Sequence, residues 1–191
     1  RTKSAAKNSP LRGAAERPLL REYTVQKRMV GKGVLSASQA AELGVVGPTA
    51  RGSGIGLDLR QTGYGAYGAL DFQPVTETAG DCFARCRVRF AETRQSIDLI
   101  RQALGRLPAG EVRQPFKGRP DGEAVSRVEQ PRGELLYYIR GDGGRHLQRV
   151  RIRTPSFANI PALLSMLPGM WLSDVPVIVL SIDPCISCTE R

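Results

Sequence analysis

A run of mostly apolar residues with helical spacing constrains the fold of this chain more than any other feature of its sequence. Asp81 is a suitable N-cap ahead of the run, and Pro108 with Gly110 would end a helix after it. Residues at such spacing share one face of a helix, so the pattern predicts one long helix that buries this face in a bundle. The run recurs at steps of three and four over about six turns: Phe83, Cys86, Phe90, Thr93, Ile97, Ile100, Leu104 and Leu107.

Later segments predict a small β region. Residues 134–140 and 146–153 flank a glycine-rich stretch that suits a hairpin turn. Residues 113–126 contain several Pro and Gly and are expected to form a connection. The glycines of residues 47–54 are too dense for a regular element, so we expect an irregular backbone there.

Two shorter helices are expected from their start signals. Ser36 and Gln39 have the spacing of a capping box, which predicts a short helix through residues 40–43. Asn159 and Pro161 predict a second helix that runs to Met166.

The chain is basic, with 28 Lys and Arg against 18 Asp and Glu and a formal net charge of +10. Such a charge favours acidic partners, namely nucleic acid, anionic lipid or a complementary subunit. Aromatic residues are only 6% of the chain, which argues against a nucleic-acid partner. No apolar run is long enough to cross a membrane, and no signal peptide is visible. We expect a basic arm or truncated segment at residues 1–22 and one domain at residues 23–191.

Four cysteines stand in two close pairs. Without a secretory signal, free thiols are expected rather than disulfides. Cys82 and Cys86 are one helical turn apart on the long helix, which favours ordinary packing. Cys185 and Cys188 have a spacing that serves zinc sites, iron–sulfur clusters and dithiol redox sites alike. Only three residues follow Cys188, so we expect no helix after this pair and disfavour thioredoxin-like chemistry.

The residues around the second pair narrow these alternatives. Asp183-Pro-Cys185-x-x-Cys188-x-x-Arg191 resembles the C-terminal motif of the large subunit of [NiFe] hydrogenases. It is most similar to the membrane-associated, energy-converting branch, which includes the formate-hydrogenlyase and CO-induced types. Five further blocks resemble, in the same order, these subunits and the related 49-kDa subunit of respiratory complex I: residues 47–54, 58–60, 80–82, 94–96 and 153–157. The complex I relatives lack the two cysteines, so Cys185 and Cys188 separate the two branches.

The resemblance implies a role for five residues. Cys185 would be a terminal thiolate on nickel, and Cys188 would bridge nickel and iron, two metals that accept soft thiolate ligands. Asp183 matches a carboxylate that positions the open coordination site and assists proton movement. Arg132 would lean over the metals and the CO and cyanide ligands of the iron, and Ser156 would donate a hydrogen bond to a cyanide.

The implied protein is part of the catalytic subunit of a [NiFe] hydrogenase, an oxidoreductase that reversibly oxidises dihydrogen or reduces protons. Its fold would be α+β and mainly helical, with a long bundle helix, a small β-hairpin region and a C-terminal metal-binding segment. Its partners would be a small subunit carrying a [4Fe–4S] cluster and other subunits of a membrane-bound complex, on the cytoplasmic face of the membrane. The family's N-terminal Cys-x-x-Cys pair is absent here, so we expect this fragment to be inactive alone.

Two other interpretations stay open. One is a complex I-like scaffold for quinone reduction in which the cysteines have lost the metal. The other is a structural zinc site or nucleic-acid-binding module, which would show a salt-dependent affinity for DNA or RNA.

Overall fold

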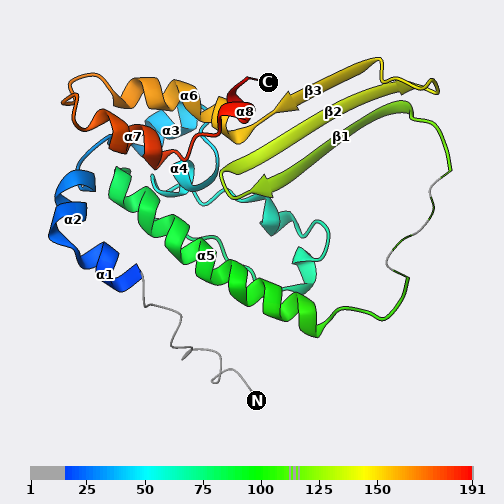
Figure 1. Cartoon of the computed structure of the whole chain (residues 1–191), viewed down its shortest axis with the longest axis horizontal. Helices are drawn as coiled ribbons and strands as arrows, with labels where there is room; N and C mark the ends of the chain where they lie inside the picture. The colour runs from blue at the N-terminus through cyan, green and yellow to red at the C-terminus, as the bar shows by residue number, and fades with distance from the viewer. Residues whose placement is uncertain (1–15, 112, 114, 116, 191) are drawn as a thin grey trace.

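The computed structural model describes residues 16–111, 113, 115 and 117–190 (Figure 1). Most of the predicted basic arm, up to residue 15, lies outside the described residues. The helices are α1 (Glu16–Arg21), α2 (Tyr23–Met29), α3 (Ala37–Glu42), α4 (Gly47–Arg51), α5 (Cys82–Gly105), α6 (Pro155–Met166), α7 (Val175–Ser181) and α8 (Ile186–Thr189), with 3₁₀ turns η3 (Leu59–Thr62) and η4 (Tyr67–Ala69). The strands are β1 (Asp121–Gln130), β2 (Gly133–Asp142) and β3 (Arg149–Arg153). The described chain therefore has an α+β fold, as expected.

The three strands form one antiparallel sheet in the order β1-β2-β3. The predicted hairpin is confirmed, because β2 pairs with β3 from Leu136 opposite Arg153 to Arg140 opposite Arg149. The expectation of an irregular connection at residues 113–126 is wrong from Asp121 onward, where β1 begins. The first seven residues of β1 are exposed, so this strand lacks the in–out alternation that marks a half-buried strand in the sequence. Its backbone bonds to β2 hold it in the sheet.

The long predicted helix is confirmed as α5, a helix of 24 residues. The carboxylate of Asp81 accepts the N–H of Ala84 and caps it, as the sequence indicated. The predicted buried face is wrong, however. Ile100 and Leu104 are 59% and 68% exposed, whereas Arg85 and Glu92, on the other side, are buried. This other face bonds to neighbouring segments through its charged groups, so polarity alone did not indicate which side of the helix is covered.

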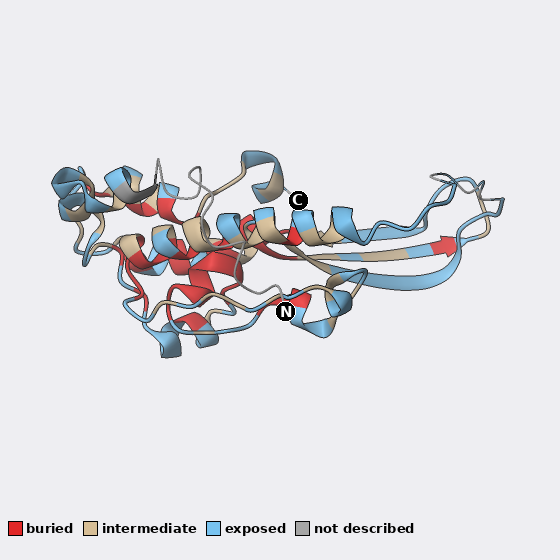
Figure 2. Cartoon of the chain, turned by 90° about the horizontal axis from the view of Figure 1, so that it is seen from below, coloured by how far each residue is buried: buried red, intermediate tan, exposed pale blue. Residues whose placement is uncertain are grey.

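The apolar core lies where α3, α4, α6 and α7 meet the start of α5 (Figure 1). Figure 2 shows most of the buried residues gathered at this end of the molecule, while the sheet extends away with β1 mostly exposed and β2 mostly half-buried or buried. The core residues come from segments far apart in the chain: Leu35, Ala40, Val45, Ala50, Cys82, Ala162, Leu163, Met166, Ile178 and Ile182. The first cysteine of the helix pair, Cys82, thus packs in the core, and Cys86 is half-buried beside it.

Several short elements differ from the expectation. The capping box of Ser36 and Gln39 is confirmed at the start of α3. The glycine-rich segment at 47–54 is not irregular throughout, because Gly47–Arg51 forms the buried helix α4 with Pro48 in its first turn. Helix α6 begins at Pro155 under a Thr154 cap, four residues before the predicted start. One helical turn, α8, forms across the second cysteine pair, from Ile186 to Thr189, and the sequence did not predict it.

None of the helices in the described part of the chain is both long enough and apolar enough to cross a membrane.

Candidate functional site

The C-terminal cysteine motif is held against the start of α6. Cys185 is the N-cap residue of α8, and its backbone N–H donates to the hydroxyl of Ser156 at 3.0 Å. The hydroxyl of Thr154, which also caps α6, donates to the backbone oxygen of Cys188. Because Ser156 accepts the bond from Cys185, its own hydroxyl proton stays free to be donated elsewhere. The junction of β3 and α6 thus fixes both ends of the Cys-x-x-Cys segment.

The tight β1–β2 turn brings Arg132 to the same place. Its Nε donates to the backbone oxygen of Asp183 at 2.8 Å and lies 3.2 Å from the Asp183 carboxylate. Asp183 has a φ of +54°, in the left-handed region where Asp is among the better-tolerated residues. Both side chains are about a third or more exposed, so this ion pair adds little stability and acts mainly to fix orientation. The structure therefore brings together Arg132, Ser156, Asp183, Cys185 and Cys188.

The thiol of Cys185 has an altered acidity. Its Sγ lies 3.2 Å from the hydroxyl of Ser187. A hydrogen bond from Ser187, with the backbone of Cys188 contributing next, lowers the pKa of the Cys185 thiol to about 7. Arg132 lowers this pKa further through its positive charge, although its contribution is smaller. A thiol with this pKa is partly ionised at neutral pH, and the thiolate is the form that binds a metal.

The donor set fits one side of a nickel–iron centre. Two thiolates suit both metals, and a free hydroxyl and a guanidinium stand beside them to hydrogen-bond small anionic ligands. Among the described residues, no group of three or more His, Cys, Asp or Glu side chains gathers to hold a metal. The described part of the chain therefore does not form a four-cysteine zinc site, and a binuclear centre would need further ligands from elsewhere.

A buried cluster of charges lies beneath this site, and no local pattern in the sequence indicates it. Arg51 is fully buried and contacts three carboxylates: Glu92 at 2.5 Å, Glu129 at 2.9 Å and Asp58 at 3.0 Å. Arg60 forms a forked pair with Asp58, at 2.9 and 2.6 Å. The block at residues 58–60 contains the local pair of Asp58 and Arg60, but the contacts of Arg51 with Glu92 and Glu129 join segments that lie far apart in the chain.

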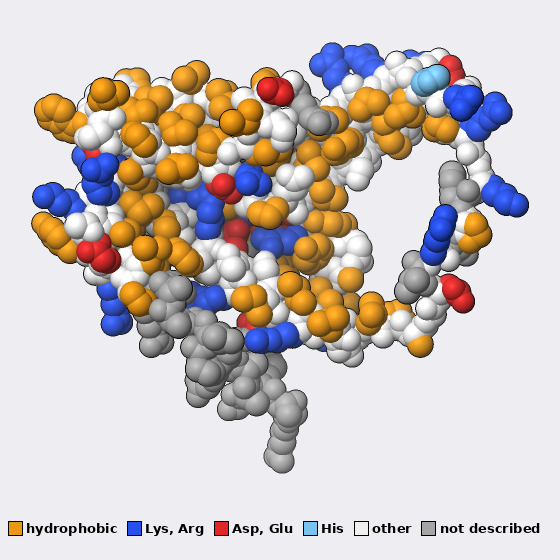
Figure 3. All heavy atoms as spheres, in the orientation of Figure 1, with side chains coloured by type: hydrophobic (Ala, Val, Ile, Leu, Met, Phe, Trp, Pro, Cys, Tyr) orange, Lys and Arg blue, Asp and Glu red, His pale blue; other side chains and the backbone are white. Residues whose placement is uncertain are grey.

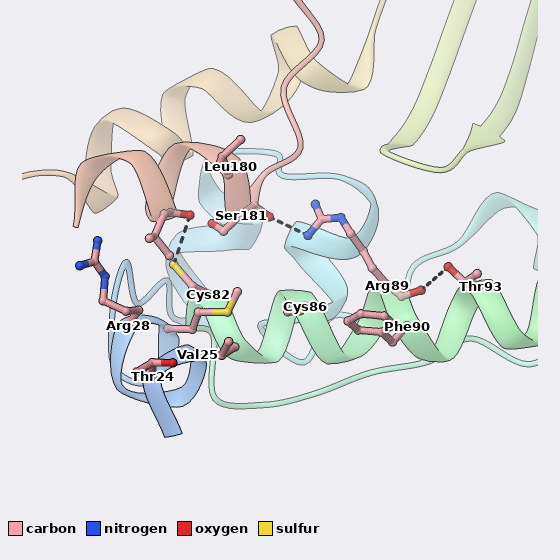
Figure 4. A pocket seen from close by; sticks show the side chains of 12 residues that line it. Thr24, Val25, Arg28, Cys82, Cys86, Arg89, Phe90, Thr93, Leu180 and Ser181 are labelled. Carbon is pink, nitrogen blue, oxygen red and sulfur yellow. Dashed lines mark hydrogen bonds between the residues drawn. The ribbon is translucent and has the colours of Figure 1, made fainter. Parts of the chain in front are cut away.

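Two more arginines, Arg85 and Arg89, both in α5, hydrogen-bond to the end of α7. Arg85 is buried and donates to the hydroxyl of Ser181, the carbonyl of Gly80 and the carbonyl of Gly33, all within 3.0 Å. Arg89 donates to the backbone oxygen of Ser181 at 2.6 Å (Figure 4). The bonds to Ser181 fix the end of α7, from which the chain leads directly to Asp183. The polar face of α5 is thus covered by segments that its arginines bond, and through Ser181 these bonds position the start of the cysteine segment.

Among the cavities beside α5 in the described part of the chain, two differ in their lining. A largely apolar one of about 600 Å³ lies between α2, α5 and α7, with Val25, Cys86 and Phe90 on its walls (Figure 4). A second, more polar cavity of about 390 Å³ is lined by Asp183, Arg89 and the buried carboxylates of Glu92 and Glu129. The second cavity is the one that reaches the candidate site.

Comparison with known proteins agrees with the resemblance indicated by the motifs. The chain is 45% identical over 170 residues to the "Carbon monoxide-induced hydrogenase" of Rhodospirillum rubrum, covering 88% of this chain and 47% of the relative. It is 40% identical to a subunit of the "F(420)H(2) dehydrogenase" of Methanosarcina mazei, with 87% and 47% covered. It is 38% identical to the alpha subunit of the "Membrane-bound hydrogenase" of Pyrococcus furiosus, with 90% and 44% covered.

The chain spans less than half the length of these relatives. All three are oxidoreductases or parts of oxidoreductases by their names. Residues 7–118 and 112–191 match the family described as "Respiratory-chain NADH dehydrogenase, 49 Kd subunit". The matches cover nearly the whole sequence and confirm the resemblance to energy-converting hydrogenases and complex I. The chain belongs to the family of the 49-kDa subunit of the respiratory-chain NADH dehydrogenase.

Proposed function

We propose that this chain is part of the catalytic subunit of an energy-converting [NiFe] hydrogenase, which interconverts dihydrogen with protons and electrons. The observation that carries this proposal is the convergence of Cys185 and Cys188 with Arg132, Asp183 and Ser156 at one site. The hydrogenases among its relatives support it. A complex I scaffold without a metal has no need of two thiols at this place.

The residues of this chain would hold one side of the centre. Cys185 and Cys188 would hold the nickel–iron centre through their thiolates, and the bound centre would supply the redox chemistry. Ser156 would turn its free hydroxyl proton toward a cyanide ligand, while its oxygen keeps the backbone of Cys185 in place. Arg132 would hold the Asp183 carboxylate beside the open coordination site.

Electrons would leave through a partner subunit that carries a [4Fe–4S] cluster. The exposed apolar residues of this region support such an interface, because Ile186, between the two cysteines, is 80% exposed, and Trp171, in the loop from α6 to α7, is 76% exposed. Figure 3 shows hydrophobic side chains spread over the face formed by α6 and α7. Large exposed apolar patches mark protein interfaces. With other subunits, the chain would lie peripherally on the cytoplasmic face of a membrane.

The test is elemental analysis of the full-length subunit in its complex, purified without oxygen. We expect about one nickel per subunit with excess iron, and loss of nickel in Cys185→Ser and Cys188→Ser. Cys86→Ser is the matched control, because Cys86 is a half-buried thiol of α5 and should leave the nickel in place. Nickel retained in Cys185→Ser, or a wild-type subunit without nickel, would contradict the proposal.

A second candidate function is a complex I-like scaffold for quinone reduction. The apolar cavity between α2, α5 and α7 favours it, since its size suits a flat apolar ring. Relatives named as subunits of "NADH-quinone oxidoreductase" share 34% to 38% identity with the chain. Quinone-dependent electron transfer by a nickel-free complex would support this alternative over the hydrogenase.

A further inference from the structure

The polar cavity beside α5 joins the cysteine segment to the buried cluster of charges. Asp183 forms one wall, next to the cysteine segment. Glu92 of α5 and Glu129 at the end of β1 also line this cavity, together with Arg89 and Arg60. A cavity of about 390 Å³ with several convergent polar groups has room for a chain of ordered water molecules.

Arg89 offers unused hydrogen-bond donors to this cavity. One nitrogen, Nη1, donates to the backbone oxygen of Ser181. Its Nε and Nη2 are shielded from solvent and have no acceptor within the part of the chain that the structure describes. A buried guanidinium rarely leaves two donors unmatched, and water in a polar cavity is the usual acceptor.

The buried carboxylates beyond Arg89 are suited to exchange a proton. Charged groups surround Glu129 on the neighbouring elements: Arg51 of α4, Asp58 and Arg60 at η3, Glu92 with Arg89 on α5, and Glu134 opposite it on β2. The N–H of Leu59 also donates to Glu129, whose own N–H donates to the hydroxyl of Tyr64. Burial raises the pKa of the Glu129 carboxyl; Arg51 opposes the rise and Asp58 adds to it. The pKa of Glu129 therefore stands above that of an ordinary carboxyl.

We propose that this cavity conducts protons between the cysteine site and the buried carboxylates, with Glu129 as the group that takes up and releases each proton. The inference rests on the proposed function, which requires a proton route at the site. Cleavage of each dihydrogen releases two protons and two electrons; the electrons leave through the partner's cluster. Each proton passes along the water chain past Arg89 to the Glu129 carboxylate, which then passes it outward and returns to its starting state. Neither Arg89 nor Glu129 is consumed in this transfer.

The test compares Glu129→Gln with Glu134→Gln in the full-length subunit within its complex. Glu134 is a matched control because its carboxylate is also buried and stands opposite Glu129 in the β1–β2 ladder, but it pairs with Arg127 and Arg153 and does not line this cavity. The readout is formation of HD from H₂ in D₂O, which requires proton access but no electron acceptor. We expect Glu129→Gln to slow HD formation about tenfold or more relative to Glu134→Gln, with nickel content equal in both.

Infrared spectroscopy supplies a readout that does not depend on the loaded enzyme. A carboxyl band that shifts in D₂O should titrate above the other carboxyls in wild type and in Glu134→Gln, and should vanish in Glu129→Gln. A Glu129→Asp variant keeps a carboxyl and should recover most of the lost rate of HD formation. No recovery would assign the loss to packing and overturn the proposal.

Two results separate this inference from the proposed function. Equal HD formation in Glu129→Gln and Glu134→Gln, in subunits that hold nickel, would overturn the proton path and leave the hydrogenase standing. A wild-type subunit with neither nickel nor HD formation would overturn the proposed function itself.

Discussion

Gly47 of α4 and Gly133 of β2 are in direct backbone contact. A Cβ added to Gly47 would lie 2.3 Å from the carbonyl oxygen of Arg132, and one added to Gly133 would lie 2.8 Å from the nitrogen of Gly47. Real Cβ atoms do not approach backbone so closely. The turn that carries Arg132 therefore packs directly against the start of α4.

Replacing Gly47 with Ala should disturb the contact between the start of α4 and the β1–β2 turn. Gly47 has a φ of +69°, which costs a residue with a Cβ about 1–2 kcal/mol, and the clash with the turn adds to it. We expect a loss of about 3 kcal/mol in the free energy of unfolding, measured by urea denaturation. Gly65→Ala is the control, because Gly65 has a φ of +59° but open space around it. Equal losses in the two variants would show that the close contact is unimportant.

Loss of the Arg51 side chain should be costly. Arg51→Leu leaves Asp58, Glu92 and Glu129 buried without their shared cation, and breaking a buried ion pair costs about 3–5 kcal/mol. Arg101→Leu removes an exposed arginine paired with Asp98 and should change stability by about 0.5 kcal/mol or less. Chemical denaturation of both variants measures the difference. A loss below about 1 kcal/mol for Arg51→Leu, on the order of a surface pair, would contradict the importance of the cluster.

The raised pKa of Glu129 predicts how stability depends on pH. The folded state binds this proton more tightly than the unfolded state, so the stabilisation that Glu129 provides is complete below the unfolded pKa of about 4.3. It is lost as the pH rises through the folded pKa. The difference in unfolding free energy between wild type and Glu129→Gln should therefore shrink as the pH rises from about 4. A difference that grows with pH would mean that attraction to Arg51 outweighs burial.

The acidity of the Cys185 thiol should depend on Ser187. In the metal-free chain, the rate of alkylation of Cys185 should follow a titration with its midpoint at about 7. Ser187→Ala removes the largest cause of the lowering, so the midpoint should move toward the ordinary cysteine value of about 8.5. Cys185→Ser identifies the signal, because the reaction with this midpoint should vanish. An unchanged midpoint in Ser187→Ala would assign the low pKa to the backbone of Cys188 and to Arg132 instead.

Two adjacent residues of α5 should respond differently to substitution. Leu99 is 6% exposed, so Leu99→Ala should cost about 2–3 kcal/mol in this chain. Ile100 is 59% exposed, so Ile100→Ala should cost less than about 1 kcal/mol. Urea denaturation of the 191-residue chain checks both values. The reverse order would show that the apolar stripe, and not the polar face, is the covered side.

Local sequence determined the elements whose signals lie close together in the chain. The spacing from Phe83 to Leu107 and the Asp81 cap specify α5 without help from other segments. Ser36 and Gln39 specify the start of α3, and the glycine-rich turn at residues 141–145 specifies the β2–β3 hairpin. Resemblance to a family identified the five candidate site residues: the C-terminal motif gave Asp183, Cys185 and Cys188, and separate blocks gave Arg132 and Ser156. Each of these elements depends on neighbours in sequence, where side chain and backbone preferences act directly.

Tertiary structure decided what depends on distant partners. Which face of α5 is buried depends on Ser181, Gly33 and Gly80, whose polar groups bond its arginines and make that face favourable to cover. Arg132 meets Asp183 across 51 positions of the chain, and Gly47 packs against the β1–β2 turn from a third segment. The positive charge of Arg51 is balanced by carboxylates from three separate segments, and no local pattern in the sequence shows that these segments meet. Long-range contacts set these features because the energy of a buried charge depends on every group around it.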